Sequence, residues 1–139
     1  MKYLLDTNAC IRYLTGRSQA LRQRLDAAGE DEIALCSVVL AELCYGAAKS
    51  VSPGRVLEIQ QRFVSRFRSL PFDDAAASIY GPIRADLERG GVPIGANDLL
   101  IAAIAVANGF ALVTHNLGEF RRVPGLSVED WERPLESEG

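Results

Sequence analysis

The stretch NDLLIAAIAVANGFALVT, residues 97–114, joins an almost wholly apolar segment to a short apolar run through a glycine. Asn97 and Asp98 are typical of a helix start, and the apolar segment behind them has no polar face, which predicts a helix packed on both sides. Gly109 is placed to end that helix, and FALVT at 110–114 predicts a strand buried on both faces. A helix that feeds a buried strand is typical of a parallel sheet covered by helices.

The same alternation of strand and helix occurs near the N-terminus. YLLD at 3–6 predicts a strand, and the residues TNACIRYL that follow predict a helix that Thr7 or Asn8 could cap. IALCS at 33–37 predicts a second buried strand, followed by a helix that ends near Gly46.

The middle of the chain predicts two amphipathic helices. The first begins at Ser52–Pro53 and places an apolar residue at every third or fourth position. The second begins at Asp73–Asp74 and ends at Gly90–Gly91. Short strands are expected between these helices at 70–72 and near the C-terminus at 126–131.

Strands that alternate with helices of this length predict a single α/β domain over residues 1–131. The expected architecture is a three-layer α/β/α sandwich with a mainly parallel central sheet and right-handed crossovers. Residues 132–139 are expected to form a frayed C-terminal tail.

Composition excludes two broad classes of protein. With 48% hydrophobic and 24% charged residues and a net charge of −3, the chain is neither disordered nor a strongly basic nucleic-acid-binding module. Of its 15 cationic residues only Lys2 and Lys49 are lysines, so the other 13 are arginines, which suit bidentate phosphate contacts. A nucleic-acid footprint would therefore have to be local.

The cysteines indicate a reducing compartment. Cys10, Cys36 and Cys44 are odd in number and lack a CxxC spacing, and the chain has one histidine, which argues against a disulfide framework and a zinc site. No apolar run approaches the roughly 20 residues of a membrane helix, and no signal peptide or membrane anchor is expected. A cytoplasmic location is the expectation.

Acidic side chains follow the predicted strands at one edge of the expected sheet. Asp6 ends the first strand, Asp98 begins a helix, and the segment from Asn116 to Glu119 follows the strand at 110–114. Glu42 lies inside an otherwise apolar helix, where a carboxylate needs a partner. Several carboxylates that share a site favour a divalent cation such as magnesium or manganese, and the matching chemistry is phosphodiester hydrolysis.

Each of these residues also has a structural interpretation. Asp6 could cap the helix after the first strand, although Thr7 is also available as a cap. Asp98 at a helix start suits the helix dipole as well as it suits a metal, and Asn116 and Glu119 could be ordinary surface residues.

Other acidic or nucleophilic enzymes fit the sequence less well. A phosphatase of the haloacid dehalogenase type would need a second aspartate where Asn8 stands, and a receiver domain or a P-loop would need a lysine after Lys49. A catalytic triad would need a histidine with a nucleophile, and His115, the one histidine, has no obvious partner of that kind. We interpret His115 as a residue at the edge of the site or on the surface.

Four segments together carry a resemblance to a known family. They are YLLDTNACIRYL, SVVLAELCYGA, IGANDLLIAAIAVANGFALVTHNLGEF and VPGLSVEDW, and in this order they resemble VapC toxins of the PIN-domain superfamily over nearly the whole chain. The resemblance implies a Rossmann-like PIN fold and a magnesium- or manganese-dependent endoribonuclease. It also implies a homodimer and inhibition by a VapB-type antitoxin.

The resemblance also assigns roles to residues. Asp6, Glu42 and Asp98 match the family's metal-binding and catalytic acids, and the position of a frequent fourth carboxylate is occupied by Asn116, with Glu119 as its candidate substitute. An amide adds no negative charge, so one well-bound ion is expected, with a second arriving together with RNA. The expected substrate contacts are Thr7, Asn8, Arg121 and Arg122, although the two arginines could equally be solvated or contact the antitoxin.

Two rival functions remain open at this point. The first is a PIN-like binding or regulatory module with a weakened site, for which Asn116 is the best support. The second is a DNA-acting metal nuclease, which would use the same ion chemistry. The sequence does not distinguish transfer RNA from other RNA targets.

Overall fold

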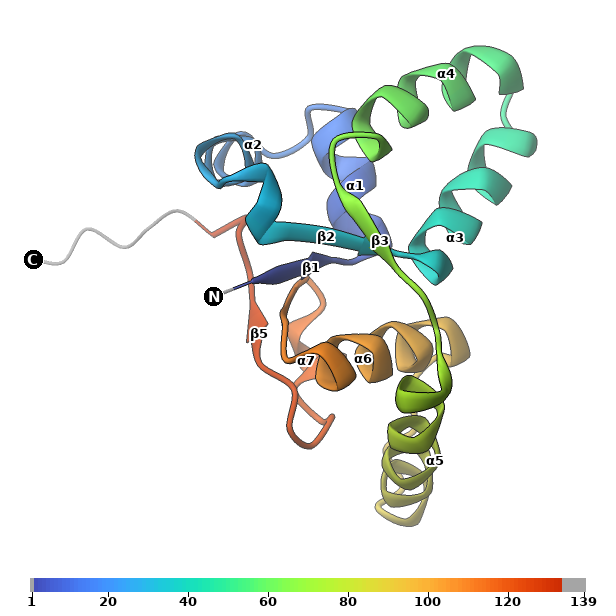
Figure 1. Cartoon of the computed structure of the whole chain (residues 1–139), viewed down its shortest axis with the longest axis vertical. Helices are drawn as coiled ribbons and strands as arrows, with labels where there is room; N and C mark the ends of the chain where they lie inside the picture. The colour runs from blue at the N-terminus through green and yellow to red at the C-terminus, as the bar shows by residue number, and fades with distance from the viewer. Residues whose placement is uncertain (1, 134–139) are drawn as a thin grey trace, which may run out of the picture.

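A five-stranded parallel sheet forms the centre of the molecule (Figure 1). The computed structural model describes residues 2–133. The strands lie in the order β3-β2-β1-β4-β5, and every neighbouring pair is parallel. Their bounds are β1 Tyr3–Leu5, β2 Ile33–Cys36, β3 Arg68–Leu70, β4 Ala111–Val113 and β5 Val128–Glu129.

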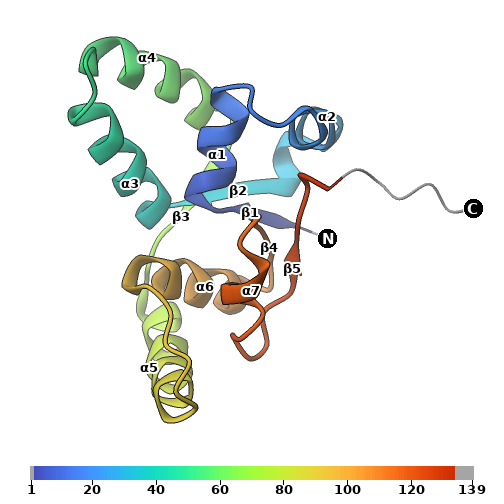
Figure 2. The ribbon, with the colours of Figure 1, turned by 180° about the vertical axis from the view of Figure 1, so that it is seen from behind.

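Helices cover both faces of this sheet, as Figures 1 and 2 show from opposite sides. One face carries the helices that connect β1 to β2 and β2 to β3: α1 Thr7–Leu14, α2 Gln19–Ala27, the 3-10 turn η1 Glu30–Glu32, α3 Ser37–Ala48 and α4 Pro53–Val64. The other face carries α5 Asp74–Arg89, α6 Ala96–Asn108 and α7 Leu117–Phe120. The predicted three-layer α/β/α sandwich is confirmed.

Burial on both faces explains why the strands read as continuous apolar runs. All four residues of β2 are buried, and so are all three residues of β4. Helix α6 packs against β4 and α5 and buries six residues, which accounts for its lack of a polar face. Gly109 ends α6 with φ 70°, a left-handed conformation that glycine adopts without strain.

The strand order creates a switch point between β1 and β4. The chain runs outward from β1 to β2 and β3, then returns to place β4 on the other side of β1. In this pair Leu5 is aligned with Val113, and the Asp6 N–H donates to the Val113 carbonyl at 3.1 Å. The residues that follow β1 and β4 therefore lie side by side at the carboxyl edge of the sheet, where α/β proteins bind ligands.

Several helix boundaries differ from the sequence predictions. The N-cap of α1 is Asp6, whose Oδ1 accepts from the Ala9 N–H at 2.8 Å, and neither Thr7 nor Asn8. Helix α3 runs past Gly46 to Ala48, because a glycine within a packed helix costs only about 1 kcal/mol. Helices α2 and α7 were not predicted.

The described chain ends with residues that are held in place. The Glu132 N–H donates to Asp130 Oδ1 at 2.9 Å, and the Glu132 carboxylate pairs with Arg12. Residues 134–139, most of the expected tail, lie outside the described residues. Among the helices of residues 2–133, none is long and apolar enough to cross a membrane.

Candidate functional site

Asp6 is the most deeply buried acid at the switch point. It is 4% exposed, caps α1, and also shares a side-chain hydrogen bond with Thr114, which follows β4. Burial raises the pKa of Asp6 to about 6, because desolvation outweighs the two hydrogen bonds that lower it, and the nearby charges of Glu132 and Glu42 raise it further. The fold therefore holds a costly carboxylate in place at this edge.

Glu42 reaches the same edge from α3. Its Oε1 accepts a hydrogen bond from the Thr7 hydroxyl at 2.6 Å, and its Oε2 accepts from Asn97 Nδ2 at 3.5 Å. Thr7 was expected to contact substrate or cap α1; its hydroxyl is used to orient Glu42. The partners expected for this half-buried carboxylate are therefore polar groups of α1 and α6.

Asp98 and Glu119 form a second pair of acids, from α6 and α7. Burial raises the pKa of Asp98 to about 6, and the neighbouring charges of Glu119, Asp6 and Glu42 raise it further. Gly95 lies against both: a Cβ built on it would be 3.8 Å from Asp98 Oδ2 and from Glu119 Oε1. The Gly95 N–H donates to Glu119 Oε1 at 2.8 Å, which fixes this carboxylate beside the start of α6.

The side chain of Asn116 is hydrogen-bonded to Glu119. Its Nδ2 donates to Glu119 Oε2 at 2.6 Å, and its backbone N–H donates to the Thr114 hydroxyl at 3.0 Å. The fourth carboxylate of the site is thus Glu119, and Asn116 orients it through the short helix α7.

We call Asp6, Glu42, Asp98 and Glu119 the acidic cluster. Within residues 2–133, no lysine, arginine or histidine pairs with any of the four within 4.0 Å. Like charges gathered in a partly buried site without a cationic side chain are unfavourable. Hard carboxylate oxygens are the ligands that magnesium and manganese prefer, so the donor set fits a divalent cation.

Two cavities flank the acidic cluster and share Asn8 and Ile11. The first has a volume of about 450 Å³, and its polar lining includes Arg12, Arg17, His115 and Asn116. The second has a volume of about 490 Å³ and is lined by Glu42 together with other polar residues and an aromatic one. Its other lining residues are Thr7, Asn8, Ile11, Ala41, Tyr45, Gly46, Lys49 and Asn97.

The structure places further cations near the cluster, in addition to the two that the sequence suggested. Arg121 and Arg122 follow α7 with exposed side chains. Arg12, Arg17 and Lys49 line the flanking cavities. Sequence reasoning named Asn8 and missed Arg12, although the two are four residues apart and so share a helix face.

A second set of polar side chains, His115, Asp130 and Glu132, lies beside the acidic cluster, and we call it the histidine cluster. His115 Nδ1 is 3.0 Å from Asp130 Oδ2 and 3.8 Å from Glu132 Oε2. Ligand atoms of these three residues all lie within 4.8 Å of one another, closer than any such set drawn from the acidic cluster in the described chain. Its two acids are also paired, Glu132 with Arg12 and Asp130 with Arg133 at 3.6 Å.

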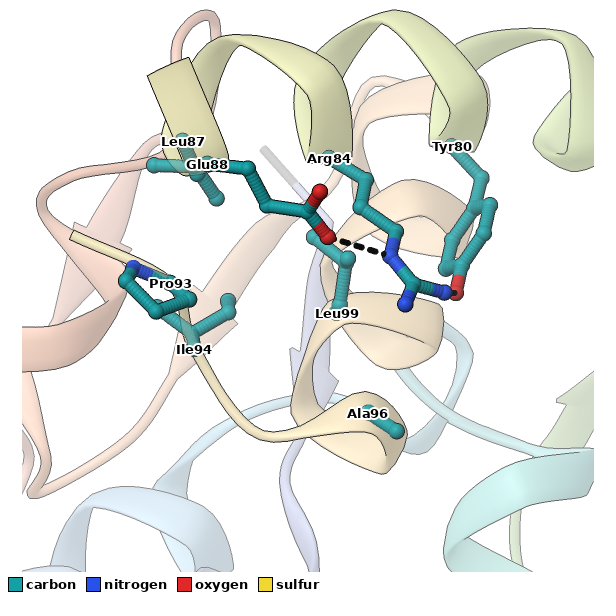
Figure 3. A pocket seen from close by; sticks show the side chains of 8 residues that line it. All are labelled: Tyr80, Arg84, Leu87, Glu88, Pro93, Ile94, Ala96 and Leu99. Carbon is teal, nitrogen blue, oxygen red and sulfur yellow. Dashed lines mark hydrogen bonds and ion pairs between the residues drawn. The ribbon is translucent and has the colours of Figure 1, made fainter. Parts of the chain in front are cut away.

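A third pocket lies away from both clusters, between α5 and the start of α6 (Figure 3). It has a volume of about 140 Å³, and Arg84 crosses it to bind Glu88 at 2.9 Å and the Tyr80 hydroxyl at 2.8 Å. Because its polar side chains satisfy one another, this pocket offers no catalytic group comparable to the acidic cluster.

Comparison with known proteins gives one consistent result. Residues 3–126 match the family model described as PIN domain. A protein of Salmonella typhimurium named tRNA(fMet)-specific endonuclease VapC is 41% identical over 131 residues, which cover 94% of this chain and 98% of that protein. A protein of Rickettsia felis named Ribonuclease VapC2 is 39% identical over 134 residues, covering 96% of this chain and all of that protein.

The fold has close counterparts among solved structures. The crystal structure of DNA-bound VapBC from Salmonella typhimurium contains a chain that superposes with a TM-score of 0.89 at 41% identity. The superposition covers 94% of this chain and 98% of the matched chain.

Proposed function

Because this chain belongs to the PIN-domain family, we propose that it is a VapC-type endoribonuclease, the toxin of a VapBC toxin–antitoxin pair. It hydrolyses phosphodiester bonds of RNA, and the reaction depends on magnesium or manganese. The relatives named VapC extend over almost the full length of the chain, which supports the same activity here.

The observation that carries this proposal is the acidic cluster. Asp6, Glu42, Asp98 and Glu119 come from four different elements and meet beside the switch point without a cationic partner within residues 2–133. Such a set suits a divalent ion, which polarises a phosphodiester and lowers the pKa of water when it is bound. Glu119 supplies the charge that Asn116 lacks, which disfavours a weakened binding module.

The surrounding residues orient these carboxylates. Thr7 holds Glu42, while the Gly95 N–H and the Asn116 amide together fix both oxygens of Glu119. Asp6, Glu42 and Asp98 would hold one ion, because a carboxylate fixed by hydrogen bonds loses little further entropy on binding. Both carboxylate oxygens of Glu119 already accept hydrogen bonds from the protein, so Glu119 is less available to a second ion. A second ion would therefore arrive together with an RNA phosphate, which would supply the missing negative charge.

The relatives also support the proposed partners. The Salmonella relative is named for tRNA(fMet), so transfer RNA is the first substrate class to test. The matched solved structure is a VapBC complex, which supports a VapB-type antitoxin as partner of this chain. We place the protein in the cytoplasm as a homodimer; its three free cysteines suit a reducing compartment.

The test is a cleavage assay with purified protein. We expect an unmodified tRNA(fMet) transcript or total transfer RNA to be cut with manganese or magnesium and to stay intact with EDTA. Single-stranded DNA of the same sequence serves as the control for the rival nuclease. Cleavage of the DNA alone, or equal RNA cleavage in EDTA, would contradict the proposal.

The cellular target can be found in the same way. Induced expression followed by sequencing of RNA ends should show new ends with the wild-type chain and none with Asp98→Asn. Identical ends in both strains would exclude the acidic cluster as their source.

A further inference from the structure

The face of α3 beyond Glu42 presents a row of three functional side chains. Glu42, Tyr45 and Lys49 are separated by three and four residues, so they follow one another along one side of the helix. With a rise of 1.5 Å per residue, Lys49 lies about 10 Å along the axis from Glu42. All three line the same cavity of about 490 Å³. The row therefore leads from the acidic cluster outward along one wall of that cavity.

Tyr45 is unusual among the aromatic residues of this chain. It is 67% exposed, whereas Phe63 and Trp131 are almost fully buried. Its ring contributes little to the core, so packing does not explain why a large aromatic side chain stands here. A flat, exposed ring beside a polar cavity can stack against a second flat group.

Lys49 supplies a positive charge next to that ring. Its Nζ lies 4.8 Å from the centroid of the Tyr45 ring, which is within the range of a cation–π contact. Within residues 2–133, no carboxylate pairs with Lys49 at 4.0 Å or less. The ammonium group is thus held over the cavity wall and remains free for an anion.

We propose that Tyr45 and Lys49 form a nucleotide-binding subsite that holds the RNA residue next to the scissile phosphate. The base stacks on the Tyr45 ring, and Lys49 contacts a neighbouring backbone phosphate. The inference rests on the proposed RNA cleavage and assigns to it a substrate contact that the carboxylates cannot make, since they repel phosphate. Aromatic stacking joined to a basic contact is how proteins bind single-stranded nucleic acid.

The surroundings favour RNA over a protein partner. Glu42 and Asn97 line the same cavity as Tyr45 and Lys49, so a ligand that fills it lies beside Glu42 of the acidic cluster. Its polar wall, formed by Thr7, Asn8 and Asn97, offers hydrogen bonds to sugar and base edges. The alternative, that the antitoxin binds this face, is one of the outcomes that the experiments below distinguish.

Binding is measured by fluorescence anisotropy with a labelled single-stranded RNA of about a dozen nucleotides, a length that covers one such groove. Full-length protein carrying Asp98→Asn is used so that the probe is not cut. Tyr45→Ala should weaken binding about tenfold, and Tyr45→Phe should restore it, because stacking needs the ring and not the hydroxyl. Tyr45→Trp should bind the probe with quenched tryptophan emission, which reports stacking directly.

Lys49 is tested by the salt dependence of the same binding. Lys49→Gln should lower the slope of log Kd against log salt by about one, as expected for one lost phosphate contact. The matched control is Lys2→Gln, which removes the other lysine at the opposite, amino edge of the sheet. The control should leave the slope unchanged.

Cleavage and complex formation then separate the possible outcomes. In the otherwise wild-type chain, Tyr45→Ala should raise KM for RNA and leave the affinity for a VapB-type antitoxin unchanged. Unchanged RNA binding with weakened antitoxin binding would overturn the inference and assign this face to the antitoxin. Equal cleavage by wild type and Tyr45→Ala would overturn the inference alone, whereas a wild-type chain that cuts no RNA would also reject the proposed function.

Discussion

The acidic cluster and the histidine cluster lie side by side at the same edge of the sheet, and they differ in charge balance. The histidine cluster brings three possible ligand atoms within 4.8 Å and surrounds its acids with Arg12 and Arg133. The ligand atoms of the acidic cluster are more widely spaced. Within residues 2–133 this cluster has no cationic partner within 4.0 Å. Close spacing of ligand atoms and unbalanced charge therefore point to different clusters.

Unbalanced charge is the criterion on which we propose the acidic cluster as the metal site. A buried carboxylate that is paired with an arginine contributes to structure, and a cation that entered would have to displace that arginine. Asp6 and Asp98 instead have a pKa raised to about 6, mainly by burial. The fold keeps them under strain that a divalent ion would relieve, which is typical of functional groups.

The largest expected effect is a loss of RNA cleavage when one acid of the acidic cluster is replaced, compared with the same replacement in the histidine cluster. Asp98→Asn should lower kcat/KM for RNA cleavage by about a thousandfold or more, because one ligand of the ion and its charge are lost. The same chemical change in the histidine cluster, Asp130→Asn, keeps the acceptor for the Glu132 N–H and should cost less than about tenfold. Equal losses in both variants would show that the two clusters form one catalytic unit.

A second test measures stability in EDTA. Asp6 has a pKa of about 6 in the fold against 3.8 as reference, so its stabilising contribution is present below pH 3.8 and is lost as pH rises through 6. At pH 7 the ionised group costs about 3 kcal/mol. Asp6→Asn keeps a cap for the Ala9 N–H and should therefore raise the free energy of unfolding by up to that amount.

The pH dependence provides the check on this second prediction. In urea unfolding followed by circular dichroism, the advantage of Asp6→Asn should shrink below pH 6 and vanish near pH 4. A variant that is less stable than wild type at pH 7 in EDTA would show that Asp6 is paired and not strained.

A third test sharpens the role of the amide beside the acidic cluster. Asn116→Asp adds a negative charge next to Glu119 and replaces the amide that donates to it. Manganese affinity, measured by calorimetry, should rise about tenfold, while stability in EDTA should fall. Unchanged affinity would mean that position 116 does not sense the ion.

The smallest effect is expected in the histidine cluster. His115 is 62% exposed, and an exposed ion pair contributes little, so His115→Gln should change the free energy of unfolding by less than about 1 kcal/mol. The number of manganese ions bound per chain should not change. A lost ion in this variant would identify the histidine cluster as a metal site after all.

Much of the fold could be predicted because its signals are local. Buried strands at 3–6, 33–37 and 110–114 read directly as apolar runs, and capping residues marked the helix start at Asp73. Helix α2 was missed although its Ser18 cap and the spacing of Leu21 and Leu25 carry a signal, because its mean composition is polar. In this segment the two leucines are outnumbered by polar and charged residues, which hide the helical spacing.

The site was only partly predictable because its details depend on packing. The gathering of Asp6, Glu42 and Asp98 follows from the edge of a parallel sheet. That Thr7 holds Glu42 requires the relative placement of α1 and α3. The spacing of Glu42 and Lys49 puts them on one side of α3, but the cavity that both line is seen only in the folded chain.

The pairing of β1 with β4 has a consequence for how the protein is made. Residues 3–5 leave the ribosome first, but their neighbours at 111–113, and both Asp98 and Glu119, are translated much later. A polypeptide interrupted before that point carries Asp6 and Glu42 without the other half of the acidic cluster, and its first strand lacks one neighbour. A copy that is interrupted before Asp98 is therefore expected to be inactive as a nuclease.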